Sequence, residues 1–203
     1  MNAATHAPTS QSRIVVSALQ CASHFFLLLG LLAAGYAGYA LGDALVYQRL
    51  EMRKFDRPAP LAEPHLLKLG EVVGEIEIPN LALKAVVVEG DSPAVLRRAV
   101  GHLPATAMPG EWGNVALAGH RDTFFRSLRG VRPGDLITLR DPGSKRFQYR
   151  VESTSVVSPK EIGVLKPAYD RQLTLITCFP FDYVGAAPNR FIVRAVEVAP
   201  PKD

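Results

Sequence analysis

Cysteine is scarce in this chain of 203 residues, which has two, and only Cys178 lies outside a long apolar segment near the N-terminus. A disulfide within the rest of the chain is therefore excluded, and Cys178 is free to react. Internal repeats, Gly-rich phosphate loops and metal-ligand spacings are also missing. The sequence therefore predicts no cofactor, and it leaves open whether calcium is required.

Charged residues are missing from one stretch near the N-terminus. Residues 14–42 contain no Asp, Glu, Lys or Arg. As a helix, the part from Phe25 to Gly42 would reach about 27 Å, close to the hydrocarbon thickness of a bilayer. We predict an uncleaved membrane anchor here. The alternative is a signal peptide that is cleaved near the small residues Gly38 and Ala40.

A dense cluster of basic residues is missing too, although the formal net charge is +4. The 23 Lys and Arg are spread along the chain, so the sequence predicts no nucleic-acid partner. Arg13 alone precedes the apolar segment, whereas four cations follow it: Arg49, Arg53, Lys54 and Arg57. By the positive-inside rule these charges favour a cytoplasmic location for the rest of the chain.

Composition divides the chain into four parts. Residues 1–13 are polar and typical of a disordered N-terminal tail, and residues 14–42 form the transmembrane anchor. Residues 43–70 combine charges with prolines, which indicates a helical stalk followed by a linker. Residues 71–203 are enough for one folded domain.

The folded part is predicted to be all-β, because short β-branched segments alternate with Gly, Pro, Asn and Asp. Seven or eight strands of this kind indicate a barrel or a sandwich. The predicted strands cover 72–78, 81–89, 114–119, 135–140, 147–157, 172–178 and 190–198. Helical pattern is limited to 93–99, 123–128 and a turn around 160–165.

Cys178 ends one of these strands, where a thiol is accessible to a substrate. A lone cysteine is more often a small buried hydrophobe, so a catalytic role needs a base or a cation nearby. His120 follows an apolar strand, whereas His102 is predicted to lie in a loop. Arg190 opens the last strand, and a hairpin would return it close to Cys178, where a guanidinium can hold an oxyanion.

Three segments together resemble the active-site signatures of the sortases, most closely those of class D and of the Gram-negative type. These segments are TLITC at 174–178, AGH at 118–120 and the arginine of NRFIVRA, Arg190. The resemblance extends over about residues 71–198. It implies a closed eight-stranded β-barrel with short helices, preceded by one N-terminal transmembrane helix. It also implies a single-pass protein of the cytoplasmic membrane whose catalytic domain is extracytoplasmic, against the count of positive charges.

The activity that the resemblance implies is that of a cysteine transpeptidase, in the peptidase and hydrolase class. Cys178 would form a thioester with an LPxTG-like C-terminal sorting signal of an exported protein, and His120 would transfer protons. Arg190 would hold the substrate and the oxyanion. Ile176 and Thr177 would form the floor of the substrate-binding cleft.

Several points stay open at the level of sequence. The second substrate would be an amine on the cell wall or on another protein. Asp122 is a candidate to orient the imidazole of His120, although a turn-capping role is favoured for it. Two other functions are compatible with these residues: a cysteine peptidase that resolves the thioester with water, and a non-catalytic domain that binds surface proteins.

Overall fold

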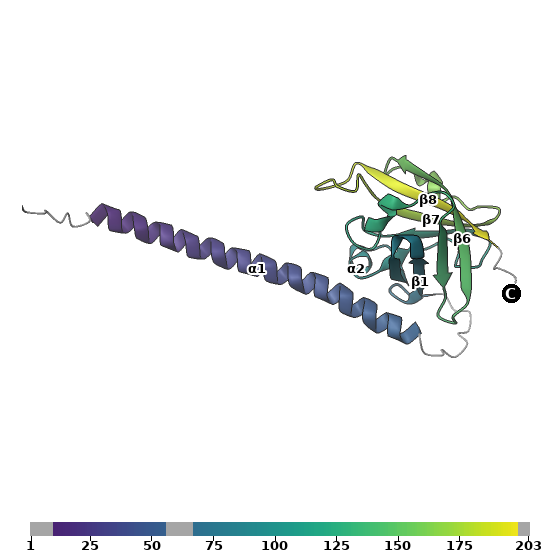
Figure 1. Ribbon diagram of the computed structural model, residues 1–203, viewed down its shortest axis with the longest axis horizontal. Helices are drawn as coiled ribbons and strands as arrows, with labels where there is room; N and C mark the ends of the chain where they lie inside the picture. Colours follow the sequence, from purple (N-terminus) through teal and green to yellow (C-terminus); the bar gives the residue numbers. More distant parts are fainter. Residues whose placement is uncertain (1–9, 56–66, 199–203) are drawn as a thin grey trace, which may run out of the picture. The chain divides into compact units, whose positions relative to one another are not determined.

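The computed structural model describes residues 10–55 and 67–198 (Figure 1). A long helix, α1 (Ser10–Phe55), precedes a β-rich unit. The strands are β1 (Val72–Ile78), β2 (Leu83–Glu89), β3 (Val100–His102), β4 (Gly113–Ala118), β5 (Leu136–Arg140), β6 (Arg146–Val157), β7 (Arg171–Phe179) and β8 (Asn189–Val198). The short helices are η1 (Pro79–Leu81), α2 (Pro93–Leu96), η2 (Arg126–Gly130) and η3 (Ile162–Leu165).

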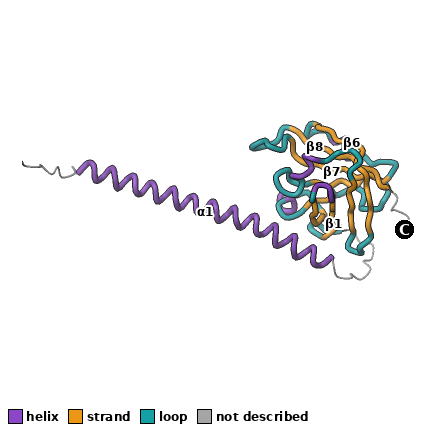
Figure 2. The backbone as a smooth tube through the Cα atoms, viewed as in Figure 1, coloured by secondary structure: helices purple, strands orange, loops and turns teal. Residues whose placement is uncertain are grey.

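The eight strands close into a barrel, which confirms the predicted fold class (Figure 2). Around the barrel their order is β1-β2-β3-β4-β7-β8-β6-β5, and pairing of β1 with β5 completes the circle. Most neighbours are antiparallel, but β2 runs parallel to β3 and β4 runs parallel to β7. The β4–β7 pair places the ends of two strands from distant parts of the sequence at the same edge.

The barrel interior is filled by side chains that alternate along each strand, as the period of a β-strand requires. Leu173 and Leu175 of β7, together with Leu117 of β4, are fully buried in this core. Tyr149 of β6 is also fully buried, and this burial raises the pKa of its hydroxyl to about 12. Because side chains alternate along a strand, the inward positions of Leu173 and Leu175 determine which side chains of β7 point outward.

Each of the seven predicted strands is present, with ends that differ by at most two residues. The eighth, β3, includes His102, so the prediction that His102 lies in a loop is wrong. A strand of three residues is too short to show a period of two. His102 is 1% exposed, and its Nδ1 lies 2.6 Å from Oε2 of Glu89. It is a buried structural histidine.

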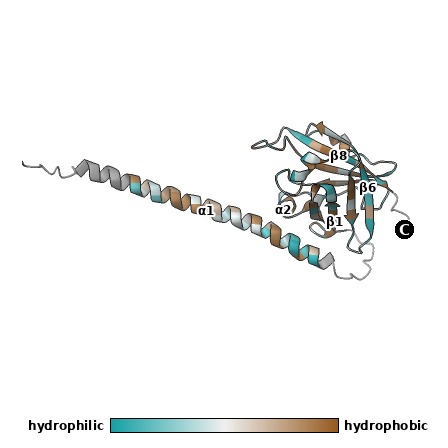
Figure 3. Ribbon diagram, viewed as in Figure 1, coloured by the Kyte–Doolittle hydropathy of each residue, from teal (hydrophilic) through white to brown (hydrophobic). Residues whose placement is uncertain are grey.

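Helix α1 is apolar over most of its length, with hydrophilic residues near its C-terminal end (Figure 3). Residues Ala22–Arg53 are long and apolar enough to cross a membrane. Helix α1 begins at Ser10, within the predicted N-terminal tail of residues 1–13. Residues 1–9 of that tail and 56–66 of the predicted linker lie outside the described residues. The last part of α1 contributes Gln48, whose Oε1 accepts a hydrogen bond from the Val86 N–H.

Candidate active site

Cys178 lies directly opposite Arg190 in the β7–β8 ladder. Opposed residues of an antiparallel pair point to the same face, with Cβ atoms about 4.5–5.5 Å apart. The alternate residues Leu173, Leu175 and Thr177 of β7 are buried. The side chains of Cys178 and Arg190 therefore project from the outer face of the barrel.

His120 reaches the same place from β4. The parallel β4–β7 register pairs Ala118 with Ile176, and the Gly119 N–H donates to the Ile176 carbonyl at 3.1 Å. The pairing ends there, and His120 and Cys178 each lie two residues farther along the chain. The segment after β4 therefore carries His120 at the edge of the barrel where β7 presents Cys178 opposite Arg190 of β8.

The turn that carries His120 is held by close packing. Gly119 lies against the ring of the buried Phe125, and a Cβ at this position would come within 2.7 Å of that ring. The Phe125 N–H in turn donates to the His120 carbonyl at 3.0 Å. A glycine before His120 is therefore required by Phe125, a residue that the sequence did not link to the site.

All three side chains are half-buried, so each is reachable from solvent without being fully hydrated. Cys178 is a free thiol. One terminal nitrogen of Arg190, Nη1, donates to the carbonyls of Ala187 at 3.4 Å and of Asn189 at 3.0 Å. A guanidinium carries five N–H donors in a fixed fork, so Arg190 retains donors for a substrate carbonyl.

Comparison with known proteins identifies the family of this chain. The family model of the sortase domain matches residues 76–198, which include the whole of the candidate site. The chain belongs to the sortase family. Sortase family enzymes are cysteine transpeptidases.

Two relatives show how far the similarity of this sortase extends. Sortase D of Bacillus subtilis is 30% identical over 191 residues, which cover 86% of this chain and 96% of the relative. The solved structure of the Clostridium perfringens sortase D5 transpeptidase matches with a TM-score of 0.66 and 27% identity. That match covers 78% of this chain and 99% of the other. The predicted resemblance to class D sortases is therefore confirmed.

The structure also places two other candidates from the sequence, Thr177 and Asp122. Thr177 is 2% exposed, and its hydroxyl donates to the Gly119 carbonyl at 2.7 Å. Thr177 has the parity of the buried Leu175, whereas Ile176 is half-buried on the outer face. Asp122 is exposed, and within residues 10–55 and 67–198 its side chain makes no hydrogen bond to His120.

The β6–β7 loop, residues 158–170, lies beside the outer face of β7 and is attached to the barrel through Asn114. Thr174 donates to Oδ1 of Asn114 at 2.7 Å, and Nδ2 of Asn114 donates to the carbonyl of Val164 in η3 at 3.0 Å. Beyond this contact lies a hollow of about 520 Å³. Its lining residues are Gly163, Lys166, Pro167, Ala168, Tyr169, Asp170, Gln172 and Arg194.

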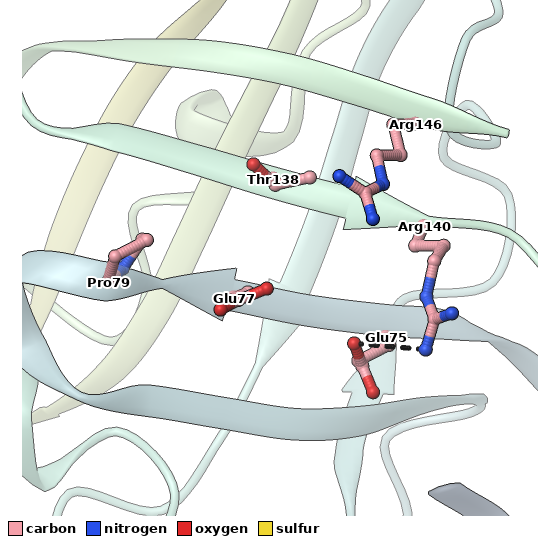
Figure 4. Close-up of a pocket in the computed structure, with 6 residues that line it drawn as sticks. All are labelled: Glu75, Glu77, Pro79, Thr138, Arg140 and Arg146. Atoms are coloured by element: carbon pink, nitrogen blue, oxygen red, sulfur yellow. Dashed lines mark hydrogen bonds and ion pairs between the residues drawn. The ribbon is translucent and has the colours of Figure 1, made fainter. Parts of the chain in front are cut away.

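A separate hollow lies on the outer side of β1 and β5 (Figure 4). Oε1 of Glu75 lies 3.2 Å from Nζ of Lys84 and 3.4 Å from Nη2 of Arg140. Charges of opposite sign on adjacent strands stabilise a sheet. The lining residues come from β1, β5 and β6 and the start of η1, so this hollow shares no residue with the candidate active site.

Arg190 and Arg194 provide a matched pair of arginines on the outer face of β8. Arg190→Ala should lower kcat by about 10²- to 10³-fold, the usual loss for one oxyanion donor, and lysine should restore only part of it. Arg194 lies four residues along the strand, about 13 Å away, so Arg194→Ala should leave kcat near that of the parent. Steady-state kinetics with a sorting peptide measures both. A silent Arg190→Ala variant beside an inactive Arg194→Ala variant would assign the role to the other arginine.

Proposed function

We propose that this chain is a membrane-anchored transpeptidase that cleaves an LPxTG-like sorting signal and transfers the protein to a surface amine. The observation that supports the proposal is the β7–β8 register, which sets Cys178 opposite Arg190, together with His120 two residues after the end of β4. A nucleophile, a proton carrier and an oxyanion donor on neighbouring chains are what acyl transfer requires. The sortase family acts on proteins with LPxTG-type signals.

In the first half of the proposed reaction, the Cys178 thiolate attacks the carbonyl carbon of a Thr–Gly type bond. The carbonyl oxygen becomes an oxyanion, which accepts hydrogen bonds from Arg190. The C–N bond then breaks, and the protonated His120 imidazole gives its proton to the leaving amine. The product is a thioester between Cys178 and the new C-terminus of the substrate protein.

The second half reverses these roles. A free amine of the acceptor attacks the thioester carbonyl, and His120, now neutral, takes the proton that the amine loses. A second oxyanion forms at the same position and is held by Arg190. The C–S bond breaks, a new amide forms, and Cys178 leaves as the thiolate with which the cycle began.

The outer face of β7 gives the substrate peptide a place to bind. Ile176 is half-buried there between Cys178 and the covered Thr174. Exposed apolar side chains stand on the loops on either side: Ile162 is 76% exposed, Tyr169 102% and Val184 96%. An extended peptide with Leu and Pro side chains fits between such walls, and burial of these apolar groups favours binding.

Helix α1 is proposed as the membrane anchor, with residues 14–42 in the bilayer, 43–70 as stalk and linker and 71–203 as the catalytic domain. Its Leu and Phe side chains are mostly exposed, for example Phe26 at 67% and Leu32 at 69%. Apolar surface of this kind is unfavourable in water and favourable in lipid. We place the catalytic domain outside the cytoplasm, because exported proteins are the substrates.

The first experiment tests the nucleophile and the acceptor together. The full chain in detergent is incubated with an LPxTG-type peptide and a glycine-based amine, and the products are separated by mass. We expect mainly the ligated product, no product from Cys178→Ala, and parent-like yield from the matched variant Cys21→Ala. Mainly hydrolysed peptide would favour a water-resolving peptidase, and cleavage by Cys178→Ala would exclude the proposed chemistry.

The second experiment tests topology, where the positive-inside rule and the proposed function disagree. A reporter is fused after Asp203. An enzyme that is active only after export should be active, and a fluorescent protein that cannot fold after export should be dark. The reverse pattern would place the domain in the cytoplasm, where exported substrates are not displayed.

A further inference from the structure

Arg121, the residue after His120, binds the loop that joins β7 to β8. Its Nη1 donates to the Pro180 carbonyl at 3.1 Å, and its Nη2 donates to the carbonyls of Tyr183 and Gly185. The guanidinium carbon also lies 5.9 Å from the centre of the Tyr183 ring. One side chain therefore satisfies three backbone carbonyls of a single loop, here called the β7–β8 loop (residues 180–188).

The β7–β8 loop needs such a partner because burial does little to hold it. Residues 182–186 are all exposed. A loop with few buried apolar contacts opens at low free-energy cost unless hydrogen bonds restrain it. The guanidinium fork suits this task, since its donors are rigidly arranged and always charged, and hydrogen bonds from charged donors are the stronger ones.

The loop also has a direct connection to the candidate active site. It begins two residues after Cys178 and ends two residues before Arg190, whose Nη1 donates to the Ala187 carbonyl within the loop at 3.4 Å. Arg121 and Arg190 thus bind the same segment, one from the β4 side and one from β8. Since Arg121 is adjacent to His120, its three hydrogen bonds tie the histidine-bearing turn to the segment between Cys178 and Arg190.

A second arginine contacts the loop in a weaker way. Nη2 of Arg129 lies 2.7 Å from Oδ1 of Asp182, and its guanidinium carbon lies 5.7 Å from the centre of the Phe181 ring. The Arg129 and Asp182 side chains are 45% and 85% exposed. Exposed ion pairs of this kind contribute little. Arg129 therefore serves as a natural control for Arg121.

We propose that Arg121 is a positioning residue for the transpeptidation reaction: it fixes the β7–β8 loop and thereby holds His120, Cys178 and Arg190 in register. This inference rests on the proposed function. A small misplacement of catalytic groups lowers the rate of the chemical step much more than it lowers substrate affinity. Loss of the Arg121 guanidinium should therefore reduce kcat while KM changes little.

The test compares Arg121→Ala, Arg121→Lys and Arg129→Ala in the full chain in detergent. Arg121→Ala should lower kcat by up to about 10²-fold with KM near the parent value. Arg121→Lys should recover only a minor part, because an ammonium cannot bond three separated carbonyls from the same geometry. Arg129→Ala should stay near the parent. Full rescue by lysine, or parent-like kcat in Arg121→Ala, would overturn the proposal.

Hydrogen exchange of the loop amides gives a readout that needs no turnover. Exchange of the Tyr183 amide, which donates to the Pro180 carbonyl at 3.4 Å, should accelerate by at least about tenfold in Arg121→Ala and in Arg121→Lys, but not in Arg129→Ala. The lysine variant keeps the charge and decides the question if the alanine variant does not fold. If the parent chain transfers no peptide, the proposed function fails, whereas unchanged loop exchange in the Arg121 variants would contradict the role of Arg121 itself.

Discussion

The hydrogen-bond register of β4, β7 and β8 is the constraint on which the site depends. A slip of one residue in β7 would turn Cys178 into the barrel and bring Thr177 out, because successive side chains of a strand alternate between faces. The slip is unfavourable because it would remove Leu173 and Leu175 from the hydrophobic core, in which both are buried. The Thr177 hydroxyl adds a bond to the Gly119 carbonyl. The apolar core therefore decides which side chains are available for chemistry.

This register also explains why strands and loops contribute differently to the site. The proposed nucleophile, Cys178, lies near the end of a hydrogen-bonded strand, whereas loops flank the proposed cleft. The β6–β7 loop is fixed through Asn114, which bonds both Thr174 and the Val164 carbonyl. Side chains that only shape the cleft can vary with the loops, while Cys178 keeps the place that the barrel gives it.

Much of this arrangement could be predicted from the sequence, because strand periodicity and the three signature segments lie in contiguous stretches. Cys178 and Arg190 were placed at strand ends by pattern alone, and the barrel followed from the resemblance. What could not be predicted depends on contacts between distant segments. The strand that holds His102 is too short to show a period, and its burial against Glu89 needs the fold. The orientation of Thr177 could have been inferred from its parity with Leu175.

Arg121 and Phe125 were also not predicted, for a related reason. Phe125 resembles any other apolar residue until its ring is seen against Gly119, and Arg121 resembles a surface cation until its three carbonyl partners are placed. Backbone carbonyls carry no signature in a sequence. Residues that hold a site together through the main chain are therefore the ones that a sequence pattern does not reveal.

Covalent capture of the substrate tests the central claim most directly. The full chain in detergent is mixed with an LPxTG-type peptide in the absence of an amine acceptor, and its intact mass is measured, followed by mapping of the modified residue. We predict a mass increase equal to the N-terminal fragment of the peptide less one water, located on Cys178 and removed by hydroxylamine. Consumption of the peptide with no adduct on Cys178, or an adduct on another residue, would contradict a thioester mechanism centred on the register of β4, β7 and β8.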